Sequence, residues 1–157
     1  MELNQKVADF TLQTDENKTV SLSDYAGQPV ILFFYPRADT PGCTIEACGF
    51  RDTFTKLQAA GAVVLGISRD TPQAQAKFRA KYDLPYTLLA DVDEKVCKEF
   101  GVLKEKNMYG KKVFGIERTT FVIGPDQALL HIFPKVTPAG HAEQVLALLN
   151  EWKTVNK

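Results

Sequence analysis

Pro29-Val-Ile-Leu-Phe-Phe-Tyr35 is an uninterrupted apolar run. Because it is apolar at both odd and even positions, it predicts a central strand that is covered on both faces of its sheet. Further strands are expected at 62–67, 86–90, 119–123 and 128–133, helices at 41–60, 72–82, 94–100 and 138–152, and a short N-terminal hairpin from 10–12 and 20–22. Strands alternate with helices early in the chain and pair directly late, which predicts an α/β fold with a central mixed sheet flanked by helices.

The composition is that of an ordinary globular protein. The chain has 157 residues, 45% of them hydrophobic and 24% charged, which predicts a single domain over residues 1–157. Nineteen basic residues balance nineteen acidic ones, so no strong field draws the protein to nucleic acid or anionic lipid. A polar connection rich in lysine, from Lys104 to Lys112, precedes the strand at 119–123.

The cysteine count and the N-terminus indicate the compartment. Three cysteines is an odd and small number, unlike that of a disulfide-rich secreted scaffold. Residues 1–6 carry no apolar signal region, and the apolar run at 30–35 is too short to span a bilayer. We therefore expect a cytoplasmic protein that does not bind membranes and in which any disulfide is transient.

Two cysteines, Cys43 and Cys48, follow the central strand in the stretch Tyr35-Pro-Arg-Ala-Asp-Thr-Pro-Gly-Cys-Thr-Ile-Glu-Ala-Cys48. On the predicted helix, Cys43 begins an apolar stripe that continues through Ala47 to Leu57, whereas Cys48 falls on a polar face. Their helical spacing corresponds to a Cα separation of about 9 Å. A disulfide tolerates no more than about 7 Å. A Cys43–Cys48 disulfide therefore requires the first turns of this helix to unwind.

The position of Cys43 at the start of a helix favours a reactive thiolate. Unpaired N–H groups and the helix dipole stabilise an anion there, and the thiolate is the nucleophilic form of cysteine. Gly42 lets another group approach the backbone closely, and the Thr40 hydroxyl can donate to a bound oxygen or to the thiolate.

A plainer interpretation of these residues is also open. Cys43 can be an inert core cysteine. Thr40 can be only a helix cap, since the Thr-Pro pairs at 71–72 and 137–138 are also expected to open helices. The strand-end position, the Thr-Pro-Gly lead-in and the second cysteine together favour the reactive site.

The segment from Pro36 to Cys43 resembles the peroxiredoxin pattern Pro-x-x-x-Thr/Ser-x-x-Cys. The extended run from Thr40 to Cys48 is similar to the peroxiredoxin Q branch, also called bacterioferritin comigratory protein. The resemblance covers almost the whole chain and includes the segments 8–12, 64–68, 100–102 and 115–121. It implies a thioredoxin-like fold.

The resemblance also implies a role for each matching residue. Cys43 would be the peroxidatic cysteine, which attacks the peroxide and becomes a sulfenic acid, and Cys48 the resolving cysteine, which condenses with it to an intramolecular disulfide. Thr40 would hydrogen-bond the peroxide, and Pro36 would shield the pocket from water. Arg118 would stabilise the thiolate and the departing oxygen.

Arg118 and Glu46 can also be judged from their positions. Arg118 stands at the start of the predicted strand 119–123, which we expect to lie beside the central strand, and a guanidinium is always charged. Glu46 lies one turn after Cys43 and is a secondary candidate that would orient Arg118 or an incoming peroxide. It can equally be an acid that only favours the first turn of a helix.

The implied function is a thiol peroxidase acting on hydrogen peroxide and on organic, including alkyl, hydroperoxides. The reductant would be thioredoxin or glutaredoxin, with no cofactor and no metal, and we expect a monomer. Two alternatives stay open. A general thiol–disulfide oxidoreductase usually carries Cys-x-x-Cys, which is absent here. A redox-sensing interaction module would use the same cysteines without turnover.

The remaining candidate residues favour structural roles. Cys97 is expected to be a buried structural cysteine. A Cys–His hydrolase would need His131 or His141 as a base beside the thiol, and neither is close to Cys43 in sequence. Zinc is not expected, because the cysteine pair lacks knuckle spacing and no second pair follows.

Overall fold

The structure, a computed structural model, describes residues 1–155 apart from the side chain of Met108. Strand β3 (Val30–Phe34) lies inside the main sheet, between β4 and β8, and all of its residues are buried. Its even-numbered side chains belong to an apolar core on one face of the sheet, and its odd-numbered side chains to a second core on the other face. The prediction of a central strand covered on both sides is confirmed.

The main sheet is mixed, as the sequence predicts. Within residues 1–155 its strand order is β2-β1-β5-β4-β3-β8-β9. β3, β4 and β5 run parallel to one another, while β8 pairs antiparallel with β3 and with β9, and β1 pairs antiparallel with β2 and with β5. The bounds are β1 Thr11–Thr14, β2 Thr19–Ser21, β4 Val63–Ser68, β5 Thr87–Ala90, β8 Thr119–Ile123 and β9 Leu129–Phe133.

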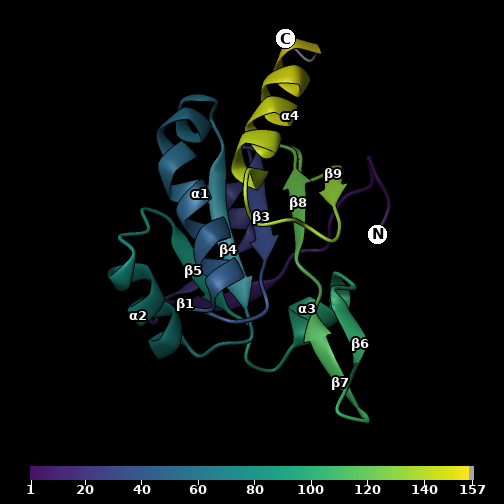
Figure 1. Cartoon of the computed structure of the whole chain (residues 1–157). Helices are drawn as coiled ribbons and strands as arrows, with labels where there is room; N and C mark the ends of the chain where they lie inside the picture. Colours follow the sequence, from purple (N-terminus) through teal and green to yellow (C-terminus); the bar gives the residue numbers. More distant parts are fainter. Residues whose placement is uncertain (156–157) are drawn as a thin grey trace.

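Helices cover both faces of this sheet (Figure 1). α1 (Pro41–Ala59), α2 (Pro72–Lys81) and α4 (His141–Val155) contribute to the core on the side of the odd-numbered residues of β3. α3 (Lys95–Glu99) contributes to the opposite core, and a short 3-10 helix, η1 (Leu22–Tyr25), follows β2. α1 and α4 lie side by side over the sheet (Figure 1). The predicted α/β architecture and the N-terminal hairpin are confirmed.

The closing helix begins later than the sequence suggests. It was expected from residue 138, but α4 starts at His141. The backbone N–H of Val136 donates to the carbonyl of Arg118 at 2.9 Å, which holds the preceding segment against the strand entry. Gly140 then reverses the chain with φ +79°, in a region that favours glycine. Thr137-Pro138 therefore opens no helix, and the expectation for this pair is wrong.

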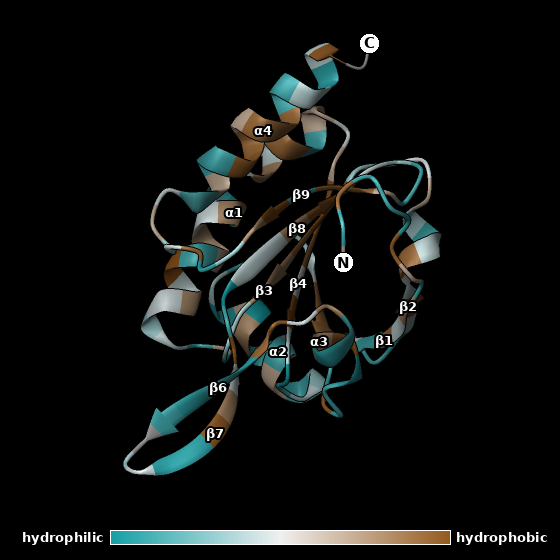
Figure 2. Cartoon of the chain, turned by 90° about the vertical axis from the view of Figure 1, so that its right-hand side faces the viewer, coloured by the Kyte–Doolittle hydropathy of each residue, from teal (hydrophilic) through white to brown (hydrophobic). Residues whose placement is uncertain are grey.

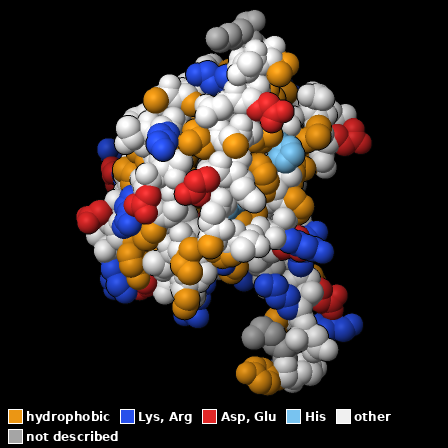
Figure 3. All heavy atoms as spheres, turned by 45° about the horizontal axis from the view of Figure 1, so that its top comes forward, with side chains coloured by type: hydrophobic (Ala, Val, Ile, Leu, Met, Phe, Trp, Pro, Cys, Tyr) orange, Lys and Arg blue, Asp and Glu red, His pale blue; other side chains and the backbone are white. Residues whose placement is uncertain are grey.

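The lysine-rich connection is a second β-hairpin. β6 (Leu103–Met108) and β7 (Lys111–Ile116) pair antiparallel and stand away from the main body (Figures 2 and 3). Residues opposite each other share one face of an antiparallel pair, so Leu103 and Ile116 close the base of this hairpin together. Towards its tip most side chains are exposed and polar, so the segment has no buried alternation by which it could be recognised in the sequence.

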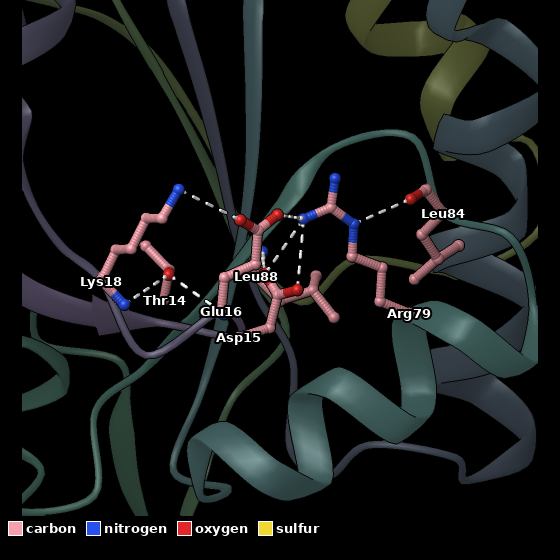
Figure 4. A network of polar contacts seen from close by, with 7 residues as sticks. All are labelled: Thr14, Asp15, Glu16, Lys18, Arg79, Leu84 and Leu88. Atoms are coloured by element: carbon pink, nitrogen blue, oxygen red, sulfur yellow. Dashed lines mark hydrogen bonds and ion pairs between the residues drawn. The ribbon is translucent and has the colours of Figure 1, made fainter.

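An ionic network anchors the N-terminal hairpin to α2 and β5 (Figure 4). Arg79 Nη1 lies 3.2 Å from both carboxylate oxygens of Asp15, and Arg79 Nε donates to the carbonyl of Leu84 at 3.0 Å. Asp15 Oδ1 also accepts from the backbone N–H of Leu88 at 3.0 Å. The Asp15 side chain is only 5% exposed, so these contacts compensate a buried charge and fix α2 against the sheet.

Surface charges of both signs are interspersed over the face shown in Figure 3. No helix within residues 1–155 combines the length and the apolar character needed to cross a membrane. The described His, Cys, Asp and Glu side chains include no group of three or more arranged to hold a metal ion.

We expect Gly66→Ala to destabilise the fold. A Cβ atom at Gly66 would lie 2.8 Å from both Leu88 Cδ2 and Phe33 Cζ, inside the core that supports α1. Overpacking of this kind costs about 1–3 kcal/mol of unfolding free energy. Urea denaturation of the reduced protein measures it.

Gly49→Ala is the matched control, because a Cβ atom there would meet Ala142 Cβ at an ordinary 3.7 Å. In the middle of α1 the change from glycine should raise stability by up to about 1 kcal/mol. Equal effects of the two substitutions would contradict the packing argument.

Candidate active site

The candidate site lies where β3 ends and α1 begins. Thr40 is the N-cap residue of α1 and has an extended backbone, Pro41 is the first helical residue, and Cys43 follows in the first turn. Proline suits this position because its φ is already helical and its missing N–H has no intrahelical partner to lose. The Cys43 side chain is 1% exposed and packs in the same core as Ala47 and Phe50. The predicted inward-facing stripe is confirmed.

Arg118 brings a positive charge to Cys43 from a distant part of the chain. β8 pairs with β3 so that Thr119 lies opposite Phe34, which places Arg118 beside the end of β3, as predicted. Arg118 Nη1 donates to Cys43 Sγ at 3.4 Å. A Cβ atom at Gly42 would lie 2.9 Å from Arg118 Nη2. The close approach expected at Gly42 is therefore present, and the approaching group is this guanidinium.

Glu46 fixes Arg118 from within α1. Glu46 Oε1 accepts from Arg118 Nη1 at 2.9 Å, and the Glu46 side chain is fully buried. Burial raises the pKa of Glu46 to about 7, although the charge and the hydrogen bond of Arg118 act in the opposite direction. Among the described residues, Glu46 Oε2 has no hydrogen-bond partner although it is buried. This contact favours the interpretation in which Glu46 orients Arg118 over that of a simple helix-start acid.

The guanidinium keeps its charge in this enclosed position. Burial tends to lower the pKa of Arg118, but the carboxylate of Glu46 and the sulfur of Cys43 raise it overall. The site therefore places a fixed cation within hydrogen-bond distance of a buried cysteine sulfur, where its N–H groups can donate to a negative charge that develops there.

Cys48 and Cys43 are not joined by a disulfide in this structure. α1 is continuous through both residues, and both are free cysteines. Cys43 is buried, while Cys48 is partly exposed. This agrees with the expectation that the intact helix keeps the two sulfur atoms apart.

Thr40 occupies the N-cap position without capping α1 through its hydroxyl. Its Oγ1 donates to the carbonyl of Arg37 at 2.9 Å, and no side-chain hydrogen bond caps the helix. Thr71 by contrast caps α2, accepting from the backbone N–H of Ala74 at 3.2 Å. Thr40 thus stands at the N-cap position that the plainer interpretation assigns to it, but its hydroxyl makes a bond other than a capping bond. Pro36 is partly buried in the same connection.

The family model described as the AhpC/TSA family matches residues 3–132, which include every residue of this site. The chain belongs to the AhpC/TSA family.

Relatives within the family are peroxiredoxins of the Bcp branch. The putative peroxiredoxin bcp of Coxiella burnetii is 52% identical over 149 residues, which cover 95% of this chain and 99% of that protein. The peroxiredoxin Bcp of Escherichia coli K12 is 44% identical over 142 residues, 90% of this chain and 91% of that protein. These matches confirm the prediction that the chain is a peroxiredoxin of this branch and therefore an oxidoreductase.

Solved structures agree with the predicted thioredoxin-like peroxiredoxin fold. A cysteine-to-serine variant of PrxQ from Xylella fastidiosa matches with a TM-score of 0.91 and 35% identity, over 100% of this chain and 98% of that one. The bacterioferritin comigratory protein of Xanthomonas campestris, described for its alkyl peroxide reduction activity, matches with a TM-score of 0.87 and 40% identity, over 90% of each chain.

Cys97 lies in the core on the other face of this peroxiredoxin's sheet and is fully buried. Burial raises the pKa of its thiol, and the neighbouring Asp91 raises it further. Asp91 is held there by accepting from the backbone N–H of Cys97 at 2.7 Å. A thiol that resists ionisation is a poor nucleophile, which agrees with the structural role expected for Cys97.

Both ring nitrogens of His141 lie within hydrogen-bond distance of residues other than Cys43. Its Nε2 lies 2.7 Å from Thr120 Oγ1 and its Nδ1 lies 3.2 Å from Gln144 Oε1. Burial lowers the pKa of His141, so the ring is neutral near physiological pH. Among the hydrogen bonds of residues 1–155, none joins His131 or His141 to Cys43, so the described contacts give no support to a Cys–His hydrolase.

Asp70 supports the site although the sequence analysis did not single it out. Asp70 Oδ2 accepts from the backbone N–H of Ala38 at 2.8 Å and from Ser68 Oγ at 2.6 Å. It thereby holds the connection between β3 and Thr40. The only available signal was an acid two residues after the end of a buried strand, which by itself indicates no partner.

We expect Glu46→Gln to flatten the pH dependence of stability. The pKa of Glu46 is raised from 4.5 to about 7 in the folded protein. Between these two values the folded protein holds a proton on Glu46 that the unfolded chain has lost. The stability that this proton confers is therefore fully present below pH 4.5 and is lost as the pH rises through about 7. The free energy of unfolding of the reduced wild type should fall between about pH 5 and pH 8, and that of the variant should fall less.

Urea denaturation at the two pH values measures this difference. Glu143→Gln, at an exposed position early in α4, is the matched control. An identical fall in Glu46→Gln and the wild type would contradict the assignment.

Proposed function

We propose that this chain is a thiol-dependent peroxidase that reduces hydrogen peroxide and alkyl hydroperoxides, with Cys43 as the nucleophile. The observation that carries the proposal is the contact of Arg118 Nη1 with Cys43 Sγ at 3.4 Å, in the first turn of a helix. The alkyl peroxide reduction activity named for the Xanthomonas campestris relative supports the substrate class.

The first step is the attack of the Cys43 thiolate on the terminal peroxide oxygen. A sulfur–oxygen bond forms and the O–O bond breaks, so the sulfur is oxidised to a sulfenic acid and the peroxide is reduced to an alcohol or water. Arg118 donates to the sulfur and to the oxygen that departs with the negative charge. The Thr40 hydroxyl exchanges its bond to the Arg37 carbonyl for a bond to the peroxide, and Pro36 limits the access of water.

The second step is resolution. After the first turns of α1 unwind, the sulfur of Cys48 attacks the sulfur of Cys43, the S–S bond forms and water leaves. A dithiol reductant of the thioredoxin or glutaredoxin type then reduces the disulfide by thiol–disulfide exchange. Because both cysteines belong to one chain, a monomer suffices for the cycle. We place this cycle in the cytoplasm, where such reductants keep disulfides transient.

The proposed cycle predicts different outcomes for the two cysteines. In an assay of hydrogen peroxide consumption coupled to thioredoxin and its reductase, Cys43→Ser should abolish turnover. Cys48→Ser should lose turnover with thioredoxin, yet still consume one equivalent of peroxide and recover activity with a small thiol.

Turnover that persists in Cys43→Ser would contradict the mechanism. One stoichiometric oxidation of the wild type without turnover would instead indicate a redox sensor. Exchange activity on unrelated disulfides without peroxide reduction would indicate a general oxidoreductase.

Arg118→Met should slow the oxidation of Cys43. The substitution keeps an apolar chain of similar length but removes the charge and the donors beside the sulfur. Removal of one donor of this kind costs about 100-fold to 1,000-fold in rate. Stopped-flow mixing with hydrogen peroxide measures the second-order rate constant, and Arg37→Met, at an exposed position of the same connection, is the matched control. A rate within a few-fold of the wild type in Arg118→Met would remove Arg118 from the mechanism.

A further inference from the structure

We propose that Tyr82, at the C-terminal end of α2, is a positioning residue for the resolution step because it binds both ends of the segment that unwinds. The proposal rests on the peroxidase cycle given above. Residues 40–50 carry Cys43 and Cys48. The residue before this segment, Asp39, and the residue after it, Arg51, both bind Tyr82. These three residues form the Tyr82 clamp.

The first contact of the Tyr82 clamp holds the entry to α1. Tyr82 OH donates to Asp39 Oδ1 at 2.7 Å, and Lys81 Nζ lies 2.9 Å from Asp39 Oδ2. The Asp39 backbone has φ +60°, a left-handed conformation that aspartate and asparagine adopt more readily than other residues with a side chain. The bond from Tyr82 to the side chain of Asp39 adds to this local preference and thereby supports the geometry in which Thr40 and Pro41 start the helix.

The second contact holds α1 beyond the two cysteines. Arg51 Nη1 donates to the backbone carbonyl of Tyr82 at 2.8 Å. This bond joins the second half of α1 to the end of α2. The segment that unwinds is thus bounded on both sides by bonds to one residue.

Tyr82 is itself firmly placed. Its ring packs edge-on against Phe78, with the centroids 5.6 Å apart. α2 is attached to the sheet by Gln75 Nε2, which donates to the carbonyl of Leu89 at 2.8 Å, and by the Arg79 network of Figure 4. α2 therefore stays in place while the beginning of α1 rearranges.

The Tyr82 clamp sets how long the sulfenic acid of Cys43 remains in the folded site. Two reactions compete for it. Resolution by Cys48 needs the helix start to unwind and releases water. The sulfenate of Cys43 can instead attack a second hydroperoxide in the folded site: a second S–O bond forms, the O–O bond breaks, the sulfur becomes a sulfinic acid and an alcohol or water leaves. Since the clamp opposes unwinding, it slows the first reaction and favours the second.

Tyr82→Phe tests this inference, because it keeps the ring and the backbone carbonyl and removes only the hydroxyl. After one equivalent of hydrogen peroxide, disulfide formation should be about twofold to tenfold faster than in the wild type, as expected for the loss of one hydrogen bond. At excess peroxide the fraction of Cys43 in the sulfinic form should fall. Rapid quenching with a thiol alkylator, followed by mass spectrometry, measures both quantities.

Two further variants separate the hydrogen bond from other causes. Asp39→Asn keeps an oxygen that accepts from Tyr82 and tolerates the left-handed backbone. It loses the ion pair with Lys81, but that pair is exposed to solvent and contributes little, so the resolution rate should stay close to that of the wild type. Tyr109→Phe, at a side chain that is 99% exposed, should change neither rate.

Unchanged or slower resolution in Tyr82→Phe would overturn the inference, as would equal acceleration in Asp39→Asn. A small fall in the melting temperature is expected from the loss of one hydrogen bond. Slower formation of the sulfenic acid in Tyr82→Phe would instead show damage to the folded site and would count against the clamp. If the wild type forms no sulfenic acid, the proposed function fails. If the wild type turns over and Tyr82→Phe behaves identically, only the clamp fails.

Discussion

One guanidinium nitrogen joins the sheet to the start of α1. Arg118 Nη1 donates to Cys43 Sγ and to Glu46 Oε1, so a single group on the entry to β8 contacts two successive turns of the helix. This contact requires the register in which β8 lies beside β3, and it requires a glycine at position 42, where a Cβ atom would meet the guanidinium. The register of β8 beside β3, the position of Cys43 and Glu46 on α1, and the glycine at position 42 are thus all needed for the contacts of Arg118.

The same interaction links the chemistry to the unwinding of the helix. In the proposed cycle, Cys43 and Glu46 both lie in the segment that unwinds before Cys48 reacts, so unwinding would remove both partners from Arg118. In the proposed cycle, the peroxide converts an anionic sulfur beside Arg118 into a sulfenic group, whose charge, where it is ionised, lies on the added oxygen. The attraction that holds the helix start is therefore weaker after the peroxide has reacted than before. In the proposed cycle, oxidation itself thus lowers the free-energy cost of unwinding the helix start, which resolution needs.

The sequence revealed the parts of the fold that depend on local apolar patterns. β3 and the inward stripe of α1 are recognisable because burial imposes a periodicity on their residues. The β6–β7 hairpin has mostly exposed, polar side chains beyond its base, so it left no such pattern. The start of α4 depends on the bond from Val136 to the carbonyl of Arg118, and the hydroxyl of Thr40 on the carbonyl of Arg37. The acceptors in both bonds are backbone carbonyls, which every residue type carries. Which carbonyl accepts therefore depends on the course of the folded chain and cannot be read from the residue types.

The weak intrinsic helicity of the first turns of α1 explains why tertiary contacts control this segment. Gly42 and Gly49 lower helix propensity, and the β-branched Thr44 and Ile45 add little to it. The helix is held there by Arg118, by the Tyr82 clamp and by Tyr86, whose hydroxyl donates to the carbonyl of Ala47 at 2.6 Å. A segment with strong propensity of its own would stay helical when these bonds break. Because contacts from outside the segment contribute to its stabilisation, a change at the sulfur that Arg118 contacts is expected, in the proposed cycle, to shift the balance between the helical and the unwound state.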